Sequence, residues 1–490
     1  MTVQVRRMLG PEPRFVYFIY SFLMGLVAIA LLPYWLVQGL RYGKYLSNLP
    51  ERLGFSFPSL EKLPADRAGA MWIHAVSVGE ALSSVTLARQ LKEAYPNRPL
   101  IVSTTTITGQ ALAGERLPFA DAIVYFPLDW TWCVRRALDA VRPAIVVILE
   151  TEIWPNFLRE AGRRRLPVVF VSGRISDRSF ARWQQQISRF GFLLRPLLRD
   201  ALGHARAFLM QSESDAERVR FLGAPAERVQ VSGNLKYDQE LPAETPLAIW
   251  LEAEAKWRGR SPIIVAGSVV ATEEPLALIA FGVLQGEFSK ALLVLAPRKP
   301  ERFGAAAEFI QESQRKFVRR SELGVPGPGM PVIKSAAAVG SSSDGGPGPA
   351  LIDAMGYGNA AIPDDATVVL VDSIGELSSL YRLADGVFVG GSLVPSGGHN
   401  ILEAAAFGKV AVFGPSMENF AEISSRFVAA GAAVQVESPE DAGVAWIEQL
   451  RDPERTKQMG EIAKNLVDAS RGASSRAMVE IARQLESAGR

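Results

Sequence analysis

Short apolar runs recur along this chain, and stretches with helical periodicity separate them. This alternation indicates parallel β-sheets whose faces are covered by helices. A first series of strands is expected at 70–75, 99–104, 121–126, 144–149 and 167–171, with helices such as 80–94 and 130–141 between them. A second series is expected at 262–267, 291–296, 366–371, 386–391 and 409–413. The two series predict an α/β fold with two doubly wound, Rossmann-like domains.

The boundary between these domains is expected near 240–258, around the sequence DQELPAETP. A chain of 490 residues is too long for a single hydrophobic core, which agrees with two domains. We therefore divide the chain into an N-terminal anchor (1–45), a first domain (46–245) and a second domain (246–490). Residues 324–349 are dense in Gly, Pro and Ser, which predicts a flexible insertion in the second domain. Residues 455–490 are expected to be helical.

An uncharged run, FVYFIYSFLMGLVAIALLPYWLV, extends from Phe15 to Val37. As a helix it would rise about 34 Å, which is enough to cross a bilayer core of about 30 Å. Aromatic residues lie toward both ends of the run, as they do at membrane interfaces: Tyr17, Tyr20, Tyr34 and Trp35. The alternative is a cleaved signal peptide, but its apolar core would be shorter and no clear cleavage site follows. We expect an uncleaved membrane helix.

The charges beside this run leave its orientation open. Arginines at 6, 7 and 14 precede it, and basic residues at 41, 44 and 52 follow it, so the two sides are nearly balanced. The single cysteine, Cys133, excludes a disulfide framework and a thiolate zinc site. The net charge of +2 says little about partners.

The sequence HAVSVGEAL places Glu80 directly after an expected strand and at the start of a helix. Ser77 stands three residues earlier, which is the spacing of a capping box, so Glu80 has a purely structural interpretation. The alternative is catalytic. Ligands of open α/β sheets bind at the carboxyl ends of the strands, where a carboxylate can accept the proton of an attacking hydroxyl.

A second acidic cluster, ETEIWPN, closes the apolar strand that ends near residue 149. Glu150 and Glu152 stand on alternate residues and are expected to share a face. Lys236, in GNLKYD, lies in a loop before the domain boundary, and alone it is consistent with an ordinary solvated lysine.

Arginine is concentrated between residues 135 and 206, which contain fourteen arginines, no lysine and six acidic residues. Guanidinium groups bind phosphate in a bidentate manner. The region is either an exposed basic face or a surface for anionic lipid or a phosphorylated acceptor, and the membrane segment favours the second interpretation. A nucleic acid partner is not expected, because no matching motif is present.

The sequence VGGSLVPSGGHNILEAAAFG, 389–408, combines glycine pairs with an expected helix. Glycines let backbone N–H groups approach an anion, which predicts a nucleotide-phosphate site, with Glu403 able to bind ribose hydroxyls. Asn400 and Glu403 also have capping-box spacing, so a structural interpretation exists here too. Arg298 follows a strand, and Gly375 and Glu376 stand near another strand end. The P-loop motif and a clean dinucleotide-binding motif are absent.

Taken together, HAVSVGE, ETEIWPN, SGNLKYD, AGSVVATEE, APRKPERF and GGSLVPSGGHNILEAAAFG resemble the 3-deoxy-D-manno-octulosonic acid (Kdo) transferases of lipopolysaccharide biosynthesis. The resemblance extends from the membrane segment to near the C-terminus. It implies the glycosyltransferase-B architecture, in which two Rossmann-like domains face a cleft. It also implies inverting transfer of Kdo from CMP-Kdo to a lipid A precursor, lipid IVA, at the cytoplasmic side of the inner membrane. The helix would then be a single-pass anchor beside anionic lipid.

The resemblance also assigns roles to residues. Glu80 matches the general base, and Glu150 and Lys236 match positions that stabilise the transition state. Three segments match the CMP-binding regions: Pro297 and Arg298; Ile374, Gly375 and Glu376; Asn400, Ile401, Leu402 and Glu403. Val270 stands where the family pattern has histidine, and the 324–349 segment is longer than expected. No D-x-D pair is present, so neither a metal nor a cofactor is expected.

Two alternatives remain open at this point. One is another membrane-anchored glycosyltransferase that uses a different nucleotide sugar on a lipid. The other is a non-catalytic scaffold that binds anionic lipid.

Overall fold

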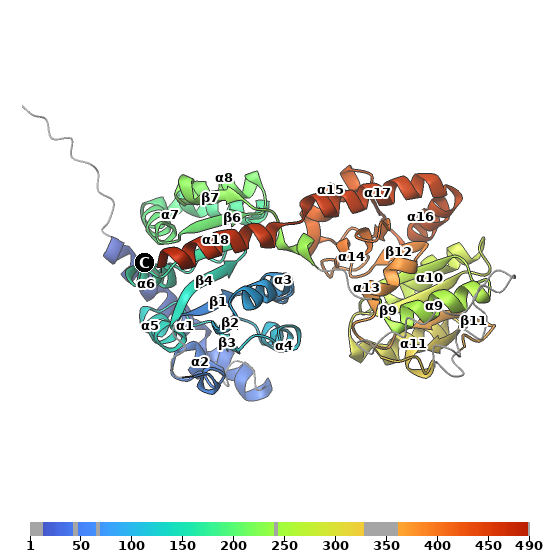
Figure 1. Ribbon diagram of the computed structural model, residues 1–490, viewed down its shortest axis with the longest axis horizontal. Helices are drawn as coiled ribbons and strands as arrows, with labels where there is room; N and C mark the ends of the chain where they lie inside the picture. Colours follow the sequence, from blue (N-terminus) through green and yellow to red (C-terminus); the bar gives the residue numbers. More distant parts are fainter. Residues whose placement is uncertain (1–12, 43–47, 65–68, 240–243, 328–360, 489–490) are drawn as a thin grey trace, which may run out of the picture. The chain divides into compact units, whose positions relative to one another are not determined.

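The computed structural model describes residues 13–42, 48–64, 69–239, 244–327 and 361–488. It divides the chain into two compact units (Figure 1). Unit 1 comprises residues 1–240 together with 470–490, and unit 2 comprises residues 241–469. Each unit contains one parallel sheet with helices on its faces, so the α/β fold class expected from the sequence is confirmed.

The sheet of unit 1 has seven strands in the order β3-β2-β1-β4-β5-β6-β7. All of its strand pairs are parallel. The strands are β1 (Ala70–His74), β2 (Leu100–Thr104), β3 (Ala122–Tyr125), β4 (Pro143–Leu149), β5 (Val168–Gly173), β6 (Ala207–Met210) and β7 (Val229–Val231). The helices of this unit are α1 (Pro13–Tyr42), α2 (Leu49–Arg52), α3 (Val78–Ala94), α4 (Ile107–Arg116), α5 (Thr131–Val141), α6 (Pro155–Arg163), α7 (Asp177–Gly203), α8 (Glu213–Leu222) and α18 (Ala473–Ala488).

The sheet of unit 2 also has seven strands, in the order β10-β11-β9-β8-β12-β13-β14. They are β8 (Ile263–Val269), β9 (Leu292–Pro297), β10 (Lys316–Arg319), β11 (Ala366–Leu370), β12 (Gly386–Val389), β13 (Ala411–Phe413) and β14 (Ala433–Gln435). The helices are α9 (Pro246–Trp257), α10 (Glu274–Gln285), α11 (Phe303–Glu312), α13 (Leu377–Leu380), α14 (Leu402–Ala405), α15 (Ala421–Ala429), α16 (Pro439–Arg451) and α17 (Pro453–Ser470).

The core of unit 1 lies on both faces of its sheet, because successive side chains of a strand point in opposite directions. Trp72 and Ile148 face one layer with residues of α5 to α8, whereas Ile73 and Val147 face the other with residues of α3, α4 and α18. Strands buried on both faces read as continuous apolar runs, which is why the central strands were visible in the sequence.

The expected strand list missed β6, β7, β10 and β14. Three of these are edge strands: β7, β10 and β14. Their sequences are only three or four residues long and carry exposed polar positions, so the apolar signal is weak. β6 is buried but is also only four residues long.

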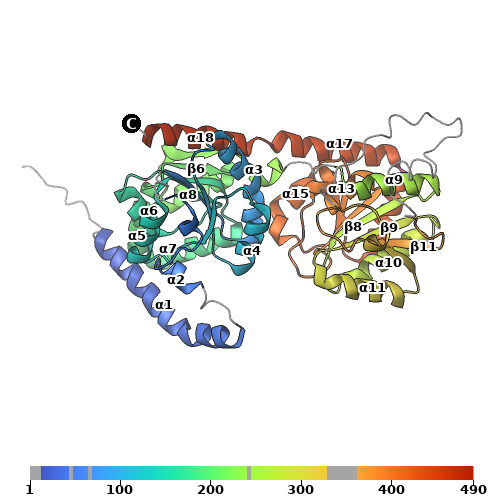
Figure 2. The ribbon, with the colours of Figure 1, turned by 60° about the horizontal axis from the view of Figure 1, so that its bottom comes forward.

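The C-terminal helix belongs to unit 1, which corrects the expected assignment of 246–490 to the second domain. Figure 2 shows α18 lying along unit 1. Ala477 and Ile481 of this helix are fully buried in the same core layer as β1 and β4. The carboxylate of Asp238 accepts hydrogen bonds from the backbone N–H groups of Gly472 and Ser474, at the start of this helix. A helix distant in sequence therefore completes the first unit.

A helix is present where the membrane segment was expected: α1 is longer than the predicted 15–37. The stretch Arg14–Pro33 is long and apolar enough to cross a membrane, and it is only 11% buried. The side chains of Tyr34 and Trp35 lie outside the described residues, as does most of the predicted 324–349 insertion.

Replacement of Ile481 by Ala should destabilise unit 1 selectively. The side chain is fully buried against the sheet, and such truncations cost roughly 2–5 kcal/mol. Hydrogen exchange should accelerate in peptides from β1 and β4 but not in peptides from β8 and β9. The matched control, Val479→Ala, changes a side chain that is 71% exposed on the same helix and should have little effect. Equal protection in both variants would contradict this packing.

Candidate functional site

The strand order of unit 1 reverses between β1 and β4, which are neighbours in the sheet. In doubly wound folds, ligands bind at this reversal, outside the carboxyl ends of the strands. β1 ends at His74 and β4 ends at Leu149, and these ends lie side by side in the sheet. Glu80 follows the first strand and Glu150 follows the second, so the fold brings both carboxylates to one edge of the sheet.

The Glu80 side chain is buried in the first turn of α3, with 5% of its surface exposed. Oε1 accepts a hydrogen bond from the Ser77 hydroxyl at 2.8 Å, and Oε2 accepts one from the Val76 backbone N–H at 2.8 Å. Ser77 in turn accepts from the Glu80 N–H at 3.3 Å. The helix-capping role is therefore confirmed, although Glu80 reaches back to Val76 rather than to the cap residue.

The Glu80 carboxylate can accept further hydrogen bonds while it caps the helix, because its two oxygens have about four acceptor positions. Its environment also changes its basicity. Burial, together with repulsion from Glu150 and then from Glu152, raises the pKa of Glu80 to about 7, against the opposing hydrogen bonds from Val76 and Ser77. A carboxylate with this pKa is a far stronger base than an ordinary glutamate, and near neutral pH it exchanges protons readily.

Glu150 occupies a left-handed backbone conformation, with φ of +54°. Such a conformation is uncommon for a residue with a Cβ atom. Its N–H donates to the Val171 carbonyl at 3.0 Å, which fixes the turn after β4. Burial and the Glu150 charge raise the pKa of the neighbouring Glu152. The turn thus concentrates negative charge beside Glu80.

Lys236 lies in a 3-10 turn (Leu235–Asp238) after β7, at the same edge of the sheet. The Asn234 side chain accepts from the Lys236 N–H at 2.9 Å and donates to Gln211 at 2.9 Å. Gln211 then donates to the Ser172 carbonyl at 2.9 Å. The ends of β5, β6 and β7 are linked by this network, which sets the position of the lysine backbone.

His74, the last residue of β1, is fully buried and stacks on Phe126 with 3.7 Å between ring centroids. Nδ1 lies 3.0 Å from the Ser103 hydroxyl. Burial lowers the pKa of His74 to about 3, so the ring is neutral. Its observed contacts are those of a core residue beside the site.

The strand order of unit 2 reverses between β8 and β12. Here the glycine-rich loop after β12 is held by a residue that the sequence analysis passed over. Glu273 is fully buried, and its carboxylate accepts from the backbone N–H groups of Gly391 at 2.6 Å, Ser392 at 3.0 Å and Leu393 at 2.9 Å. An internal carboxylate therefore occupies these three amides, and the nucleotide-phosphate site expected in the glycine-rich stretch stays a prediction for its remaining residues. The sequence signal that could have identified Glu273 was its position shortly after the end of β8.

Arg298 follows β9 and is exposed, and its backbone N–H donates to the Val269 carbonyl at 2.8 Å. The Arg298 charge affects the pKa values of two neighbouring side chains, His399 and Tyr381. Burial and then Arg298 lower the pKa of His399 to about 4, and burial, Glu403 and Arg298 together leave the pKa of Tyr381 well above its usual value. Pro297, the last residue of β9, is buried. The strand end therefore presents the Arg298 guanidinium beside a neutral histidine.

His399 is a second residue that the sequence analysis did not single out, although the chain has only three histidines. Within the described part of the chain, its buried Nε2 has no hydrogen-bond partner. A Cβ atom on Gly391 would lie 2.9 Å from this nitrogen, so only glycine leaves it space. A neutral imidazole with an unused nitrogen can bind a polar ligand.

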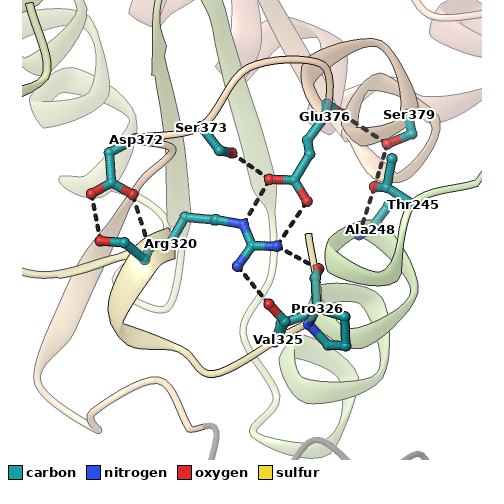
Figure 3. Close-up of polar contacts among 10 residues, drawn as sticks. Thr245, Ala248, Arg320, Val325, Pro326, Asp372, Ser373, Glu376 and Ser379 are labelled. Atoms are coloured by element: carbon teal, nitrogen blue, oxygen red, sulfur yellow. Dashed lines mark hydrogen bonds and ion pairs between the residues drawn. The ribbon is translucent and has the colours of Figure 1, made fainter. Parts of the chain in front are cut away.

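The segment Ile374–Glu376 combines an exposed side chain, a glycine at φ +93° and an interior carboxylate. Glu376 is fully buried and forms a two-pronged ion pair with Arg320, at 2.7 and 3.1 Å (Figure 3). Arg320 also donates to the carbonyls of Val325 and Pro326. The Glu376 carboxylate thus holds the loop together, and any ligand would meet the exposed side of the loop at Ile374 and Gly375.

The helix expected after the glycine pairs is a single turn, Leu402–Ala405. Ile401 and Leu402 are buried in the core, so their backbone is the part available to a ligand. The Asn400 side chain accepts from the Leu402 N–H at 3.1 Å and donates to Glu403 at 3.4 Å. Glu403 also accepts from the Ser378 hydroxyl, which links this turn to α13. The capping geometry expected for Asn400 and Glu403 is therefore present in modified form.

The described ranges contain no group of three or more His, Cys, Asp or Glu side chains that could hold a metal ion.

Known proteins resemble this chain in both sequence and fold. A family model described as 3-deoxy-D-manno-octulosonic-acid transferase matches residues 47–239. The 3-deoxy-D-manno-octulosonic acid transferase of Haemophilus influenzae is 29% identical over 436 residues, covering 88% of this chain and 90% of that protein. The enzyme of the same name from Bordetella pertussis is 31% identical over 431 residues, covering 85% and 88%.

Two solved structures also resemble the chain. The C-terminal CMP-Kdo binding domain of WaaA from Acinetobacter baumannii is 27% identical, with a TM-score of 0.36, and covers 45% of this chain and 97% of that one. Anabaena HepE in complex with UDP is 12% identical, with a TM-score of 0.49, and covers 86% and 100%.

The relative from Bordetella pertussis is matched over most of both chains, and the family model spans the unit that carries Glu80, Glu150 and Lys236. This chain therefore belongs to the 3-deoxy-D-manno-octulosonic acid transferase family.

Proposed function

We propose that this family member transfers Kdo from CMP-Kdo to a lipid A precursor, lipid IVA, with inversion at the anomeric carbon. The observation that carries the proposal is the pair of neighbouring carboxylates at the strand reversal of unit 1. Burial of Glu80, and then repulsion from Glu150, raise the pKa of Glu80 so that it can accept a proton near neutral pH. The relatives that match most of the chain carry the name of the same activity, which favours Kdo over another sugar.

In the proposed reaction, an acceptor hydroxyl of the lipid attacks the anomeric carbon of Kdo. The hydroxyl proton passes to Glu80 as the new carbon–oxygen bond forms. The bond from the anomeric carbon to the phosphate oxygen breaks, and CMP leaves with its electron pair. Protonated Glu80 keeps its bond from the Val76 N–H, so the helix cap survives the step. Glu150 and Lys236 are proposed to stabilise the charge that develops at the sugar.

The donor nucleotide is proposed to bind unit 2 at the carboxyl edge of β8, β9 and β12. Arg298 would pair with the single phosphate, because an exposed guanidinium beside a neutral histidine has little competing charge. The backbone of Ile374 and Gly375 and the turn at Asn400–Glu403 would contact the nucleotide. CMP bears only one phosphate, so one arginine is a reasonable match, and neither a metal nor a cofactor is proposed.

The proposed location is the cytoplasmic side of the cell inner membrane, with unit 1 held there by α1. This placement brings the lipid acceptor to the unit that carries the base. It also explains why nine large apolar side chains of α1, between Phe15 and Leu32, are exposed in a water-soluble α/β unit.

Replacement of Glu80 by Gln should reduce transfer by roughly 10²- to 10⁴-fold, because the amide cannot accept the proton. The assay is incubation with CMP-Kdo and lipid IVA, read by mass spectrometry, which also counts the sugars added. Asp215 provides a matched control: this buried carboxylate accepts from the Ser212 hydroxyl at 2.6 Å and from the Ile175 N–H at 2.7 Å, and so caps α8 in the same way. Asp215→Asn should leave the turnover of folded enzyme intact. Comparable losses of transfer in the two variants would show that Glu80 only caps its helix.

The decrease of kcat/KM at acidic pH, the acidic limb of the pH profile, should report the protonation of Glu80. With a pKa of about 7 for Glu80, kcat/KM should fall tenfold per pH unit below neutrality and level off above it. Glu152→Gln removes a charge that raises this pKa, so the limb should move to lower pH. Glu115→Gln, which changes an exposed acid on α4, should leave the limb in place. A flat profile from pH 5 to 8 would refute the assignment.

A further inference from the structure

The first half of α1 is docked on unit 1 by specific polar contacts. The Tyr17 hydroxyl donates to Asp200 of α7 at 3.0 Å, and the Tyr20 hydroxyl donates to Asp129 at 2.9 Å. Val16 and Tyr17 are 2% exposed and pack on Leu197. The helix therefore meets the globular unit near its beginning.

The chain is held by the same part of unit 1 again shortly after α1 ends. The Arg52 carbonyl accepts from the Leu128 N–H at 2.9 Å. Tyr20 and Arg52 thus contact consecutive residues of the protein, Leu128 and Asp129. Glu51 adds a second bond, accepting from the Tyr125 N–H at 2.8 Å. Residues 20 and 52 are therefore attached to the same part of unit 1.

Chain length then limits what the segment between residues 20 and 52 can do. From Tyr20 to Tyr42 the helix rises about 33 Å. A helix that crossed a hydrocarbon core of about 30 Å would leave Tyr42 on the far side. Only six residues lead from Tyr42 to Asn48, with a reach of at most about 22 Å. That return would also carry unpaired backbone and Lys44 through lipid, which the bilayer does not tolerate.

We propose that α1 lies along the membrane surface as a one-sided anchor, in place of the single pass expected from the sequence. An apolar stripe at helical spacing is exposed along this helix: Phe15, Phe18, Phe22, Leu26 and Ile29 are all at least 48% exposed. The other exposed large apolar side chains lie beside it: Leu23, Val27, Leu31 and Leu32. This stripe would enter the interfacial region by about 5–10 Å. Both ends of the chain then remain on one side of the membrane. The inference adds to the proposed function a topology that the activity does not require.

Reporters that are active on only one side of the membrane test this directly. A reporter fused before Met1 and the same reporter fused after Arg490 should give the same sidedness in the full chain. As a control, an added 20-residue apolar helix between the first reporter and Met1 should reverse its signal. Opposite sidedness of the two original fusions would overturn the one-sided anchor. Transfer assays on the same fusions report the proposed function separately.

A second, independent observation concerns the amino-terminal edge of the same sheet. A pocket of about 820 Å³ opens there, between the starts of β4 and β5 and the end of α18. Five arginines line it, with one acid, Asp139: Arg98, Arg142, Arg164, Arg165 and Arg206. Leu166, Pro167 and Leu485 contribute an apolar wall. This volume is that of a small-molecule site.

The charge in this pocket is only partly balanced. Arg164 is paired with Asp139 at 2.7 Å, and Arg98 donates to the Gly69 carbonyl at 2.9 Å. The side chains of Arg165 and Arg206 have no hydrogen bond or ion pair to any residue that the structure describes. By contrast, Glu160 outside the pocket binds two other arginines of the arginine-rich region.

The backbone conformation of two of these arginines also supports a binding role for the pocket. Arg142 and Arg165 both adopt left-handed conformations, with φ of +49° and +55°. Glycine or asparagine avoids the steric cost at such positions, yet both turns place an arginine there. The pocket is also remote from the carboxylates: β4 runs from Pro143 at the pocket to Glu150, about 20 Å away. A group bound at one end is not in contact with the other.

We infer that this pocket binds a phosphate-bearing anion, because forked guanidinium groups around an apolar wall suit a phosphate ester. A phospholipid headgroup and a free phosphate compound share that chemistry. The two helices that hold the start of α1, through Arg159 over the Tyr17 ring and through Asp200, end beside the pocket. The membrane source is therefore within reach.

The test uses the full chain in neutral detergent and measures its thermal stability with phosphatidylglycerol, phosphatidylcholine or inorganic pyrophosphate. Phosphatidylglycerol should raise the Tm more than phosphatidylcholine does, and Arg165→Glu with Arg206→Glu should abolish that difference. Arg455→Glu with Lys457→Glu, an equal charge change on exposed positions of α17, should preserve it. Equal stabilisation by pyrophosphate would identify a free phosphate as the source. Retention of the phosphatidylglycerol effect in the pocket variant would overturn the site.

Discussion

The burial of Glu80 beside the charge of Glu150, at the strand reversal of unit 1, is the constraint on which the proposed chemistry depends. Glu80 follows β1 and Glu150 follows β4, and only the pairing of these two strands brings the charges together. A carboxylate that merely capped a helix would have its pKa lowered by its hydrogen bonds, as the Val76 and Ser77 bonds tend to do here. Burial and the second charge outweigh those bonds. One residue can therefore cap a helix and act as a base, because the two roles use different lone pairs.

Unit 2 uses buried carboxylates for a different purpose. Glu273 binds three consecutive amides of the glycine-rich loop, and Glu376 is neutralised by Arg320. Both groups are fully buried and fully engaged, so removal of either partner would leave an uncompensated charge. They fix the loops in place and leave the open positions to Arg298 and His399. Carboxylates after strand ends are thus proposed to serve catalysis in unit 1, and they support loops in unit 2.

The sequence predicted the central strands and the position of Glu80 because both depend on local pattern: continuous apolar runs, and a capping motif directly after one of them. It could not predict that α18 completes unit 1, because that contact joins residues more than 200 positions apart through Asp238 and Gly472. Nor could it show that Glu273 fills the amides of the glycine loop, since the same glycines would suit a phosphate. The roles of Glu150 and Lys236 came from family resemblance, and spacing alone did not distinguish them from surface charges.

The contacts of α1 show how tertiary structure changes the meaning of an apolar segment. By length and hydropathy the segment suits a membrane crossing, and the flanking charges do not decide its orientation. Once Tyr20 and Arg52 are tied to neighbouring residues of one unit, a crossing would require the return chain to cross as well. A helix along the surface satisfies both the apolar stripe and the two attachments.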